Sequence, residues 1–242
     1  MIVSICLMCD SLHRSLLSLT MNTIYESSKL NLKITVLKEG YCKPTKNNED
    51  GEPCFHAEGS ITLVETEAHK VLVDTGGPWD KPYLIDAFKE LGLGLEEVDY
   101  VIGTHGHSDH IGNLNLFPGA THIVGWDVCK RDLYTSHSFS DGKPYLINSE
   151  LVVMPTPGHT HHDVSLVVHD GEKKIVIAGD LFESENDIDD PSLWRDCSED
   201  PKTQEINRRK IIDMADIIVP GHGPAFQVKM SYRTKLEAND LP

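Results

Sequence analysis

Short runs of β-branched and other apolar residues recur along the chain, separated by turn-forming or charged segments. Runs of this kind predict strands that are buried on one or both faces. We expect strands at 33–38, 60–66, 70–74, 98–103, 121–125, 151–154, 164–169, 174–178 and 217–219. Apolar residues spaced three to four apart predict helices at 80–91, 109–116 and 203–214. This alternation predicts one α/β domain in which two sheets pack face to face with helices outside.

The boundaries of the domain are predicted from the segments that flank and interrupt it. Residues 1–30 are expected to be a loose N-terminal extension, 31–230 the folded domain and 231–242 a C-terminal tail. Segment 43–53 is rich in Lys, Asn, Glu and Pro, which predicts a polar loop. Segment 183–190 carries five carboxylates in eight residues, which predicts a solvated loop.

The overall charge restricts the partners. The 242 residues include 22 Lys+Arg and 38 Asp+Glu, a formal net charge of −16. Such a protein is repelled by nucleic acid and by anionic membranes, so binding a polyanion needs a local positive source. The one compact basic cluster, 208–210, is expected on the outer face of the helix at 203–214, whose Ile206, Ile211 and Met214 are expected to face inward.

The remaining composition bears on the compartment. No run of about 18 apolar residues is present, and residues 1–20 lack the basic start of a signal peptide, so we expect no membrane association. The six cysteines are irregularly spaced, which predicts reduced thiols rather than a disulfide framework. The expected location is therefore the cytoplasm and the nucleus.

A dense set of metal-capable side chains directly follows the predicted strand at 98–103. His105, His107, Asp109 and His110 form the pattern H-x-H-x-D-H. Imidazole and carboxylate groups are ligands that suit zinc and iron. His105 and His107 can face one point, and Asp109 and His110, on the following turn, can face a second point nearby.

Three later segments each place one ligand-type residue beside a glycine at the end of a predicted strand. They contribute His159, Asp180 and His222. Glycine allows the sharp backbone turn and close approach that such a position requires. Because one zinc takes three or four protein ligands, seven ligands predict two metals that share a bridging carboxylate. Two Zn²⁺ are expected, with iron or manganese as alternatives.

These motifs, in order, resemble those of a known family. The Asp-Thr-Gly turn at 74–76, the histidine cluster and the three later ligands are similar to the five ordered motifs of the metallo-β-lactamase fold superfamily, over residues 33–226. Longer strings at 72–79 and 103–113 resemble an animal family linked to hydrolytic processing of histone pre-mRNA 3′ ends. The resemblance implies an αββα four-layer sandwich of two mixed sheets with outer helices, metals at one edge, and a homodimer.

The resemblance also implies two ligand sets that share Asp180. The first set is His105, His107 and His159, and the second is Asp109, His110 and His222. The resemblance implies that Asp74 supports the histidine loop without binding metal itself. The alternative is that Asp74 is an ordinary carboxylate in a turn. Thr104 is expected either to hydrogen-bond a ligand side chain or to be an ordinary loop residue.

The segment after His159 departs from the usual superfamily pattern. His161 and His162 stand where many members continue with a small segment. These imidazoles and Trp194 are candidate contacts to substrate at the rim of the site. The alternatives are a solvated loop for the histidines and core packing for Trp194.

The expected chemistry is hydrolysis, because two divalent ions lower the pKa of a bridging water. We expect attack by a metal-bound hydroxide, with Asp109 and Asp180 as catalytic ligands that orient or receive the proton. The resemblance implies an endoribonuclease acting on single-stranded RNA, although the acidic charge argues against it. A small-molecule hydrolase of thioesters, lactones or lactams stays open. So does a non-catalytic metal-binding protein, against which the open ligand sets argue. No long substrate-gripping arm or added recognition segment is expected.

Overall fold

Two mixed sheets lie face to face in the computed structural model, which describes residues 20–28 and 31–238. The strands of the first sheet, in spatial order, are β1 (Asn22–Ser27), β2 (Leu32–Lys38), β5 (Ile61–Glu65), β6 (Lys70–Val73), β7 (Tyr100–Gly103), β8 (Thr121–Val124), β9 (Asp127–Lys130) and β10 (Leu133–Thr135). Those of the second are β11 (Tyr145–Leu146), β12 (Leu151–Pro155), β13 (Val164–His169), β14 (Lys174–Gly179), β15 (Ile217–Pro220) and β16 (Phe226–Gln227).

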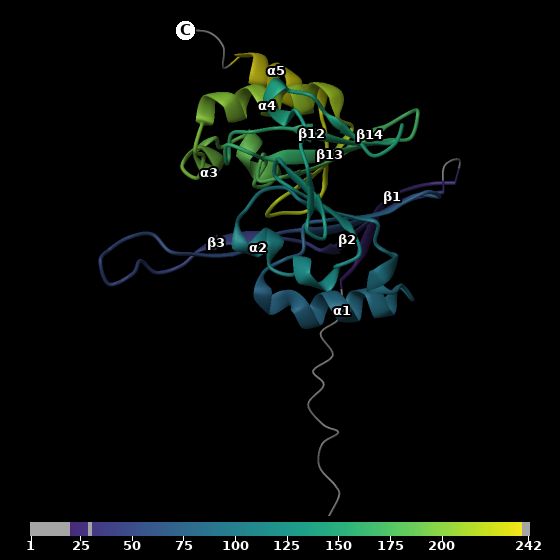
Figure 1. Ribbon diagram of the computed structural model, residues 1–242. Coiled ribbons are helices and arrows are strands. Elements are labelled where there is room, and N and C mark those ends of the chain that lie inside the picture. The colour runs from purple at the N-terminus through teal and green to yellow at the C-terminus, as the bar shows by residue number, and fades with distance from the viewer. Residues whose placement is uncertain (1–19, 29–30, 239–242) are drawn as a thin grey trace, which may run out of the picture.

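Helices cover the outer face of each sheet (Figure 1). Helix α1 (Lys81–Glu90) lies on the first sheet, and α4 (Pro201–Met214) and α5 (Met230–Ala238) lie on the second. The short helices α2 (Ser108–Ile111) and α3 (Ser192–Arg195) lie in the connecting loops. The predicted αββα sandwich is confirmed.

Three apolar layers hold this arrangement together. Between the sheets, side chains such as Ile34 and Ile102 of the first sheet belong to one buried apolar cluster with Leu166 of the second. Phe88 of α1 packs on the outer face of the first sheet, and Ile211 of α4 packs on the outer face of the second. Both faces of the central strands are therefore buried, which explains why their sequences read as continuous apolar runs.

Parallel pairing brings four strand ends to one edge of the sandwich. Strands β6, β7 and β8 are parallel in the first sheet, and β14 and β15 are parallel in the second. Because the carboxyl ends of parallel strands lie at the same edge, the loops that follow β6, β7, β14 and β15 converge there.

Both expected chain boundaries need correction. Strand β1 pairs antiparallel with β2, so the sheet begins within the range expected to be a loose extension. In α5 the side chain of Tyr232 is buried against the second sheet, so the expected tail begins with a packed helix. Residues 1–19, with Cys6 and Cys9, and residues 239–242 lie outside the described residues.

Two helix predictions also need correction. The predicted helix at 109–116 is interrupted, since α2 ends at Ile111 and a separate 3₁₀ turn covers Leu114–Leu116. Asn113 separates them, because its side-chain amide donates to the carbonyls of the turn after β6. In α4, Ile206 was expected inside but is 56 % exposed.

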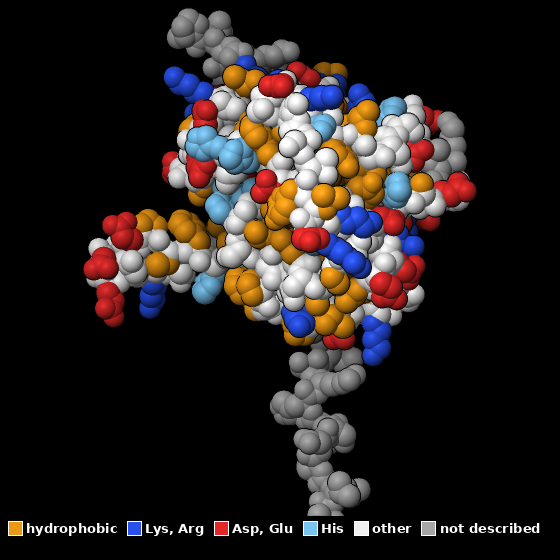
Figure 2. Space-filling model, viewed as in Figure 1, with side chains coloured by type: hydrophobic (Ala, Val, Ile, Leu, Met, Phe, Trp, Pro, Cys, Tyr) orange, Lys and Arg blue, Asp and Glu red, His pale blue; other side chains and the backbone are white. Residues whose placement is uncertain are grey.

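A two-stranded hairpin projects from the body of the protein. Strands β3 (Tyr41–Pro44) and β4 (Phe55–Glu58) pair antiparallel and form the long arm in Figure 1. The expected loop at 43–53 is therefore mostly the tip of this arm, which the sequence did not predict. Figure 2 shows mainly acidic side chains at its tip. Across the part of the chain that the structure describes, no helix is long and apolar enough to cross a membrane.

Candidate metal centre

Five sequence-distant loops converge at the edge where the parallel strands end. Asp74 directly follows β6, His105 follows β7, and His159 follows β12. Asp180 directly follows β14, and His222 lies two residues beyond β15. The structure brings the last four of these residues together with His107, Asp109 and His110 as candidate metal ligands, in the two groups described below; Asp180 and His222 also form a third group with Glu183.

The first group consists of His105, His107, His159 and Asp180. The Nδ1 atom of His107 lies 2.9 Å from Nε2 of His105 and 3.1 Å from Nε2 of His159. Both Nε2 atoms lie 3.4–3.5 Å from Oδ2 of Asp180. A tetrahedral zinc with bonds of about 2.0–2.1 Å separates its ligand atoms by about 3.3 Å, so these four atoms match a zinc site.

The second group consists of Asp109, His110 and His222, again beside Asp180. The Nε2 atom of His110 lies 3.2 Å from Oδ1 of Asp180, and Nε2 of His222 lies 3.2 Å from Oδ2. Oδ2 of Asp109 lies 3.7 Å from the first nitrogen and 3.8 Å from the second. Asp180 therefore lies between the two groups, with Oδ1 near His110 and Oδ2 near His222 as well as near the first-group histidines.

Two buried atoms show that these groups suit cations. Nε2 of His110 and Oδ1 of Asp180 are buried and lie 3.2 Å apart, but neither makes a hydrogen bond of good geometry. A buried polar atom without a partner is costly, and a cation between the two would satisfy both. The donor set of imidazoles and carboxylates is the one that zinc prefers, so the residues present fit two divalent metals.

In the metal-free chain the two groups differ in charge, because the pKa of His105 is lowered whereas that of His110 is raised and a cation has to replace its proton. Burial lowers the pKa of His105, and the neighbouring His110 lowers it further, so His105 is neutral and free to bind a metal. Burial also opposes the charged form of His110, but Asp180 and Asp74 outweigh it and raise the pKa of that histidine. The pKa of Asp180 lies well below its usual range: burial disfavours the carboxylate, but the surrounding histidines outweigh it.

Asp74 lies beneath the histidine loop and braces it. Its carboxylate accepts hydrogen bonds from the backbone N–H of Thr104 at 2.7 Å, from the Thr104 hydroxyl at 2.9 Å and from Nδ1 of His110 at 2.8 Å. The Thr104 oxygen lies 3.1 Å from Nδ1 of His105. Both histidines therefore present Nε2 to the centre. Asp74 has a φ of +58°, which is unusual for a residue with a side chain.

Glycine is required where two of the loops touch. A Cβ on Gly221 would lie 1.8 Å from Oδ1 of Asp180, and one on Gly179 would lie 2.5 Å from the hydroxyl of Thr104. Gly179 also has a φ of +55°. Any side chain at Gly221 would therefore displace the shared carboxylate.

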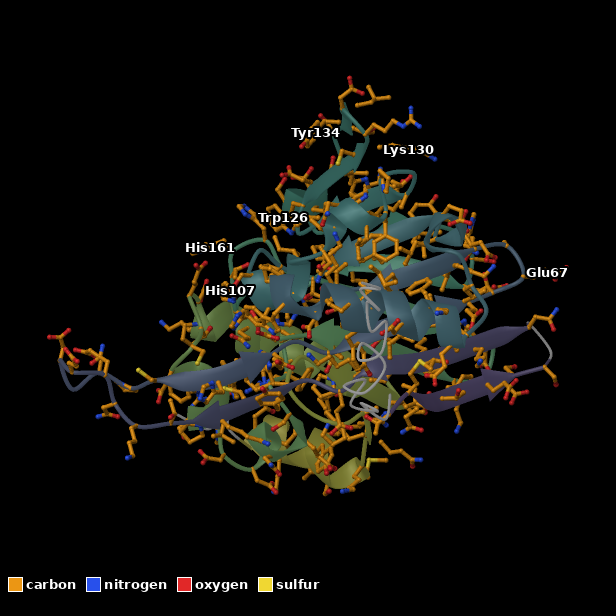
Figure 3. All side chains as sticks on the ribbon, turned by 90° about the horizontal axis from the view of Figure 1, so that it is seen from below. Glu67, His107, Trp126, Lys130, Tyr134 and His161 are labelled. Carbon is orange, nitrogen blue, oxygen red and sulfur yellow. The ribbon has the colours of Figure 1, made fainter. Side chains whose placement is uncertain are left out.

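The three candidate rim residues have different surroundings. His161 is exposed and its Nδ1 lies 2.5 Å from Glu199. His162 is exposed, and its ring contacts that of Trp126 in a tilted arrangement, with 4.6 Å between the ring centroids. In Figure 3, His107, His161 and Trp126 lie on the same side of the molecule. Trp194 is only 2 % exposed and lies inside the protein, so the alternative of core packing is confirmed and the candidate substrate contact is wrong.

The acidic segment expected to be solvated contains two buried carboxylates. Asp187 is 1 % exposed and forms a two-pronged ion pair with Arg208 of α4. Arg208 is itself 1 % exposed, so it does not lie on the outer face of α4. Glu183 is 8 % exposed and lies beside His159 and His222. The apolar neighbours Phe182 and Ile188 were the only signal in the sequence for this burial.

The arm also contributes to the centre, which sequence reasoning missed. The backbone carbonyl of Glu58, the last residue of β4, accepts a hydrogen bond from Nδ1 of His222 at 3.0 Å. Gly59 follows and lies against the His110 ring, because a Cβ there would meet it at 2.8 Å. The base of the hairpin thus holds two ligands of the second group. Backbone contacts of this kind leave no mark in the sequence.

Comparison with known proteins agrees with the motifs and the fold. Residues 57–137 and 146–224 match the model of the Metallo-beta-lactamase superfamily. The chain is 44% identical over 198 residues to Metallo-beta-lactamase domain-containing protein 1 of Xenopus laevis, covering 81% of each chain. It is 39% identical over 224 residues to the Homo sapiens protein of that name, covering 81% of this chain and 82% of the relative.

A solved structure of a dizinc quorum-quenching lactonase superposes with a TM-score of 0.60 at 17% identity, covering 84% of this chain and 90% of the lactonase. At that identity the likeness concerns the fold. The sequence match covers both halves of the sandwich, including the loops that carry the seven ligands. This chain therefore belongs to the metallo-β-lactamase superfamily.

Proposed function

We propose that the chain is a dinuclear zinc hydrolase that cleaves single-stranded RNA at phosphodiester bonds. The observation that best supports hydrolase activity is the pair of metal-ligand groups that share Asp180. Two divalent cations held there supply an activated water and neutralise negative charge on the substrate. The preference for RNA is supported by the sequence resemblance to the animal family linked to histone pre-mRNA processing.

The chain's own residues divide the remaining work. His105, His110 and Asp180 are buried and hold a fixed frame, whereas His107 is exposed and Asp109 is partly exposed. The centre therefore opens at His107 and Asp109, where the substrate enters. Asp109 is the carboxylate placed to orient the attacking water and receive its proton, since it combines contact with both second-group histidines and access to solvent.

The distribution of basic residues favours a second candidate, a hydrolase of small thioesters, lactones or lactams. The compact cluster at 208–210 was the strongest candidate for gripping a phosphate backbone, and Arg208 is buried in an ion pair. On the face shown in Figure 2, lysine and arginine side chains are scattered rather than joined in a stripe. A small neutral substrate needs no such stripe, whereas RNA binding depends on it.

Two further parts of the proposal concern the surroundings of the enzyme. Cys42, Cys54, Cys129 and Cys197 are free thiols, which supports a reducing compartment such as the cytoplasm and nucleus. The homodimer implied by the resemblance stays a prediction, which sedimentation of the purified chain would test.

The deciding experiment incubates the zinc-loaded chain with single-stranded RNA of the histone pre-mRNA type, with DNA of matched sequence, and with a thioester and lactone panel. Asp180→Asn serves as the inactive control. RNA cleavage that disappears in the control, and that falls steeply as salt rises, supports the proposal. With two metals bound, turnover of the small-molecule panel alone would replace RNA with the second candidate.

A further inference from the structure

The ligand histidines follow one rule with a single exception. In each ring, one nitrogen faces the centre and the other needs a partner that fixes the ring. Nδ1 of His105 contacts Thr104, Nδ1 of His110 contacts Asp74, and Nδ1 of His222 contacts the carbonyl of Glu58. His107 is exposed, so water can form a hydrogen bond with its second nitrogen.

His159 is the exception. Its Nε2 faces the first donor group, and its Nδ1 is buried without a hydrogen-bond partner. The atom opposite is Oε1 of Glu183, 3.7 Å away, and it too is buried without a partner. Two unpartnered buried atoms of complementary type face each other across a gap about half an ångström longer than a hydrogen bond.

The backbone of Glu183 is fixed from several directions. Its N–H donates to Asp187 at 2.7 Å, and its carbonyl accepts from the backbone N–H of His222 at 2.8 Å. Asp187 is in turn held by Arg208. The carboxylate is therefore presented to His159 by a rigid segment, and only rotation of its own side chain or the imidazole is needed to close the gap.

We propose that Glu183 is a positioning residue of the metal centre, whose carboxylate accepts the Nδ1–H of His159 and so holds Nε2 toward the first metal. The proposal rests on the dinuclear centre proposed above. Carboxylates that orient a ligand imidazole raise its basicity, and their removal typically weakens metal binding about 10–100-fold. A hydrogen-bonded Glu183 completes the set of partners for the buried histidines.

A competing role for Glu183 is direct metal coordination. Its Oε2 lies 3.9 Å from Nε2 of His222, and Asp180, Glu183 and His222 together could hold an ion. The two roles differ in which metal depends on the residue. Positioning through His159 affects the first metal, whereas coordination beside His222 affects the second.

The test measures zinc binding by chelator competition for Glu183→Ala, Glu183→Gln and the full-length wild type. Glu185→Gln is the matched control, since Glu185 is a partly exposed carboxylate two residues away that pairs with Lys229. We expect Glu183→Ala to weaken one zinc about 10–100-fold and to leave the other within about threefold. Glu183→Gln keeps an acceptor oxygen, so it should recover part of the loss, and Glu185→Gln should match wild type.

Two readouts separate positioning from coordination and from loss of folding. In proton NMR of the zinc-loaded chain, the hydrogen-bonded Nδ1–H signal of His159 should disappear in Glu183→Ala, while those of His110 and His222 remain. Combining Glu183→Ala with His159→Ala should weaken zinc no more than His159→Ala alone, because one residue acts through the other. Circular dichroism of each variant checks the fold.

Three results would overturn the proposal. They are unchanged zinc affinity in Glu183→Ala, persistence of the His159 Nδ1–H signal, or loss of the zinc held by His110 and His222. A wild type that binds no zinc would overturn the proposed function as well. If the wild type binds two zinc ions and the Glu183 variants bind them equally well, only the role of Glu183 would be overturned. None of these measurements depends on the substrate.

Discussion

The buried ion pair between Asp187 and Arg208 offers a prediction whose size follows from the structure. The guanidinium donates to Asp187 at 2.5 and 2.9 Å and to the carbonyl of Leu181 at 2.8 Å. It lies over two aromatic rings, 4.2 Å from the centroid of Phe182 and 4.8 Å from that of Trp194. Water has no access, since both charged side chains are at most 1 % exposed.

Changing Asp187→Ala leaves the Arg208 charge uncompensated in this apolar setting. Breaking a buried pair on one side costs about 3–5 kcal/mol, against a total stability of about 5–15 kcal/mol for a typical domain. For a chain of this length each kcal/mol lowers Tm by about 2–4 °C, so we expect a fall of about 6–20 °C. The control is Asp189→Ala, because Asp189 is an exposed carboxylate two residues away, and its loss should cost less than about 0.5 kcal/mol.

The assay is urea unfolding of chelator-treated protein, followed by circular dichroism, so that metal binding does not add to the stability. The double variant Asp187→Leu with Arg208→Met should lose less stability than the sum of the two single changes. Each single change leaves one buried charge without its partner, whereas the double variant leaves none. A loss below about 1 kcal/mol for Asp187→Ala would refute the reasoning. It would mean that Arg208 reaches solvent, and the cluster at 208–210 would again be a candidate RNA contact.

Three further predictions concern the centre itself. Asp74→Asn should weaken zinc binding about 10–100-fold in chelator competition, because the amide cannot accept every hydrogen bond that Thr104 and His110 donate; unchanged affinity would contradict the bracing role. Gly221→Ala should displace Asp180 and abolish binding of the second zinc. Mass spectrometry of the native protein counts the bound zinc ions, and two retained zinc ions would contradict this prediction. In metal-free protein, burial opposes the charge on His222 but Asp180 raises its pKa to about 9. Since the folded pKa exceeds the unfolded value of about 6.5, the resulting stability should be full below about pH 6.5 and lost as pH rises through 9. Urea unfolding at both ends of that range checks this, and His222→Gln should remove the difference.

The strand predictions agree well with the structure because both faces of the central strands are buried. Residues 100–102 of β7 and 175–178 of β14 form uninterrupted runs of apolar and aromatic residues, which makes these strands visible without tertiary information. The arm formed by β3 and β4 was missed because its residues are mostly exposed and polar. Its pairing is stabilised by backbone hydrogen bonds, which any sequence of that length can form.

The histidine cluster could be identified from sequence because its ligands are local. His105, His107, Asp109 and His110 lie within six residues, so their side chains must share one region of space whatever the rest of the chain does. His159, Asp180 and His222 were recognised by their place at strand ends. Which of them would face which group followed only from the resemblance, and the donor distances are properties of the folded chain.

The sequence by itself therefore determined the layered fold and the identity of the ligand side chains, because both depend on short-range patterns. Only the tertiary structure decided the environment of Glu183, Asp187 and Arg208. The sequence predicted that these charged side chains are exposed to solvent, because charged residues usually are. They are buried because α4 packs over the loop after β14, and a contact between segments about 20 residues apart leaves no periodic pattern in either one.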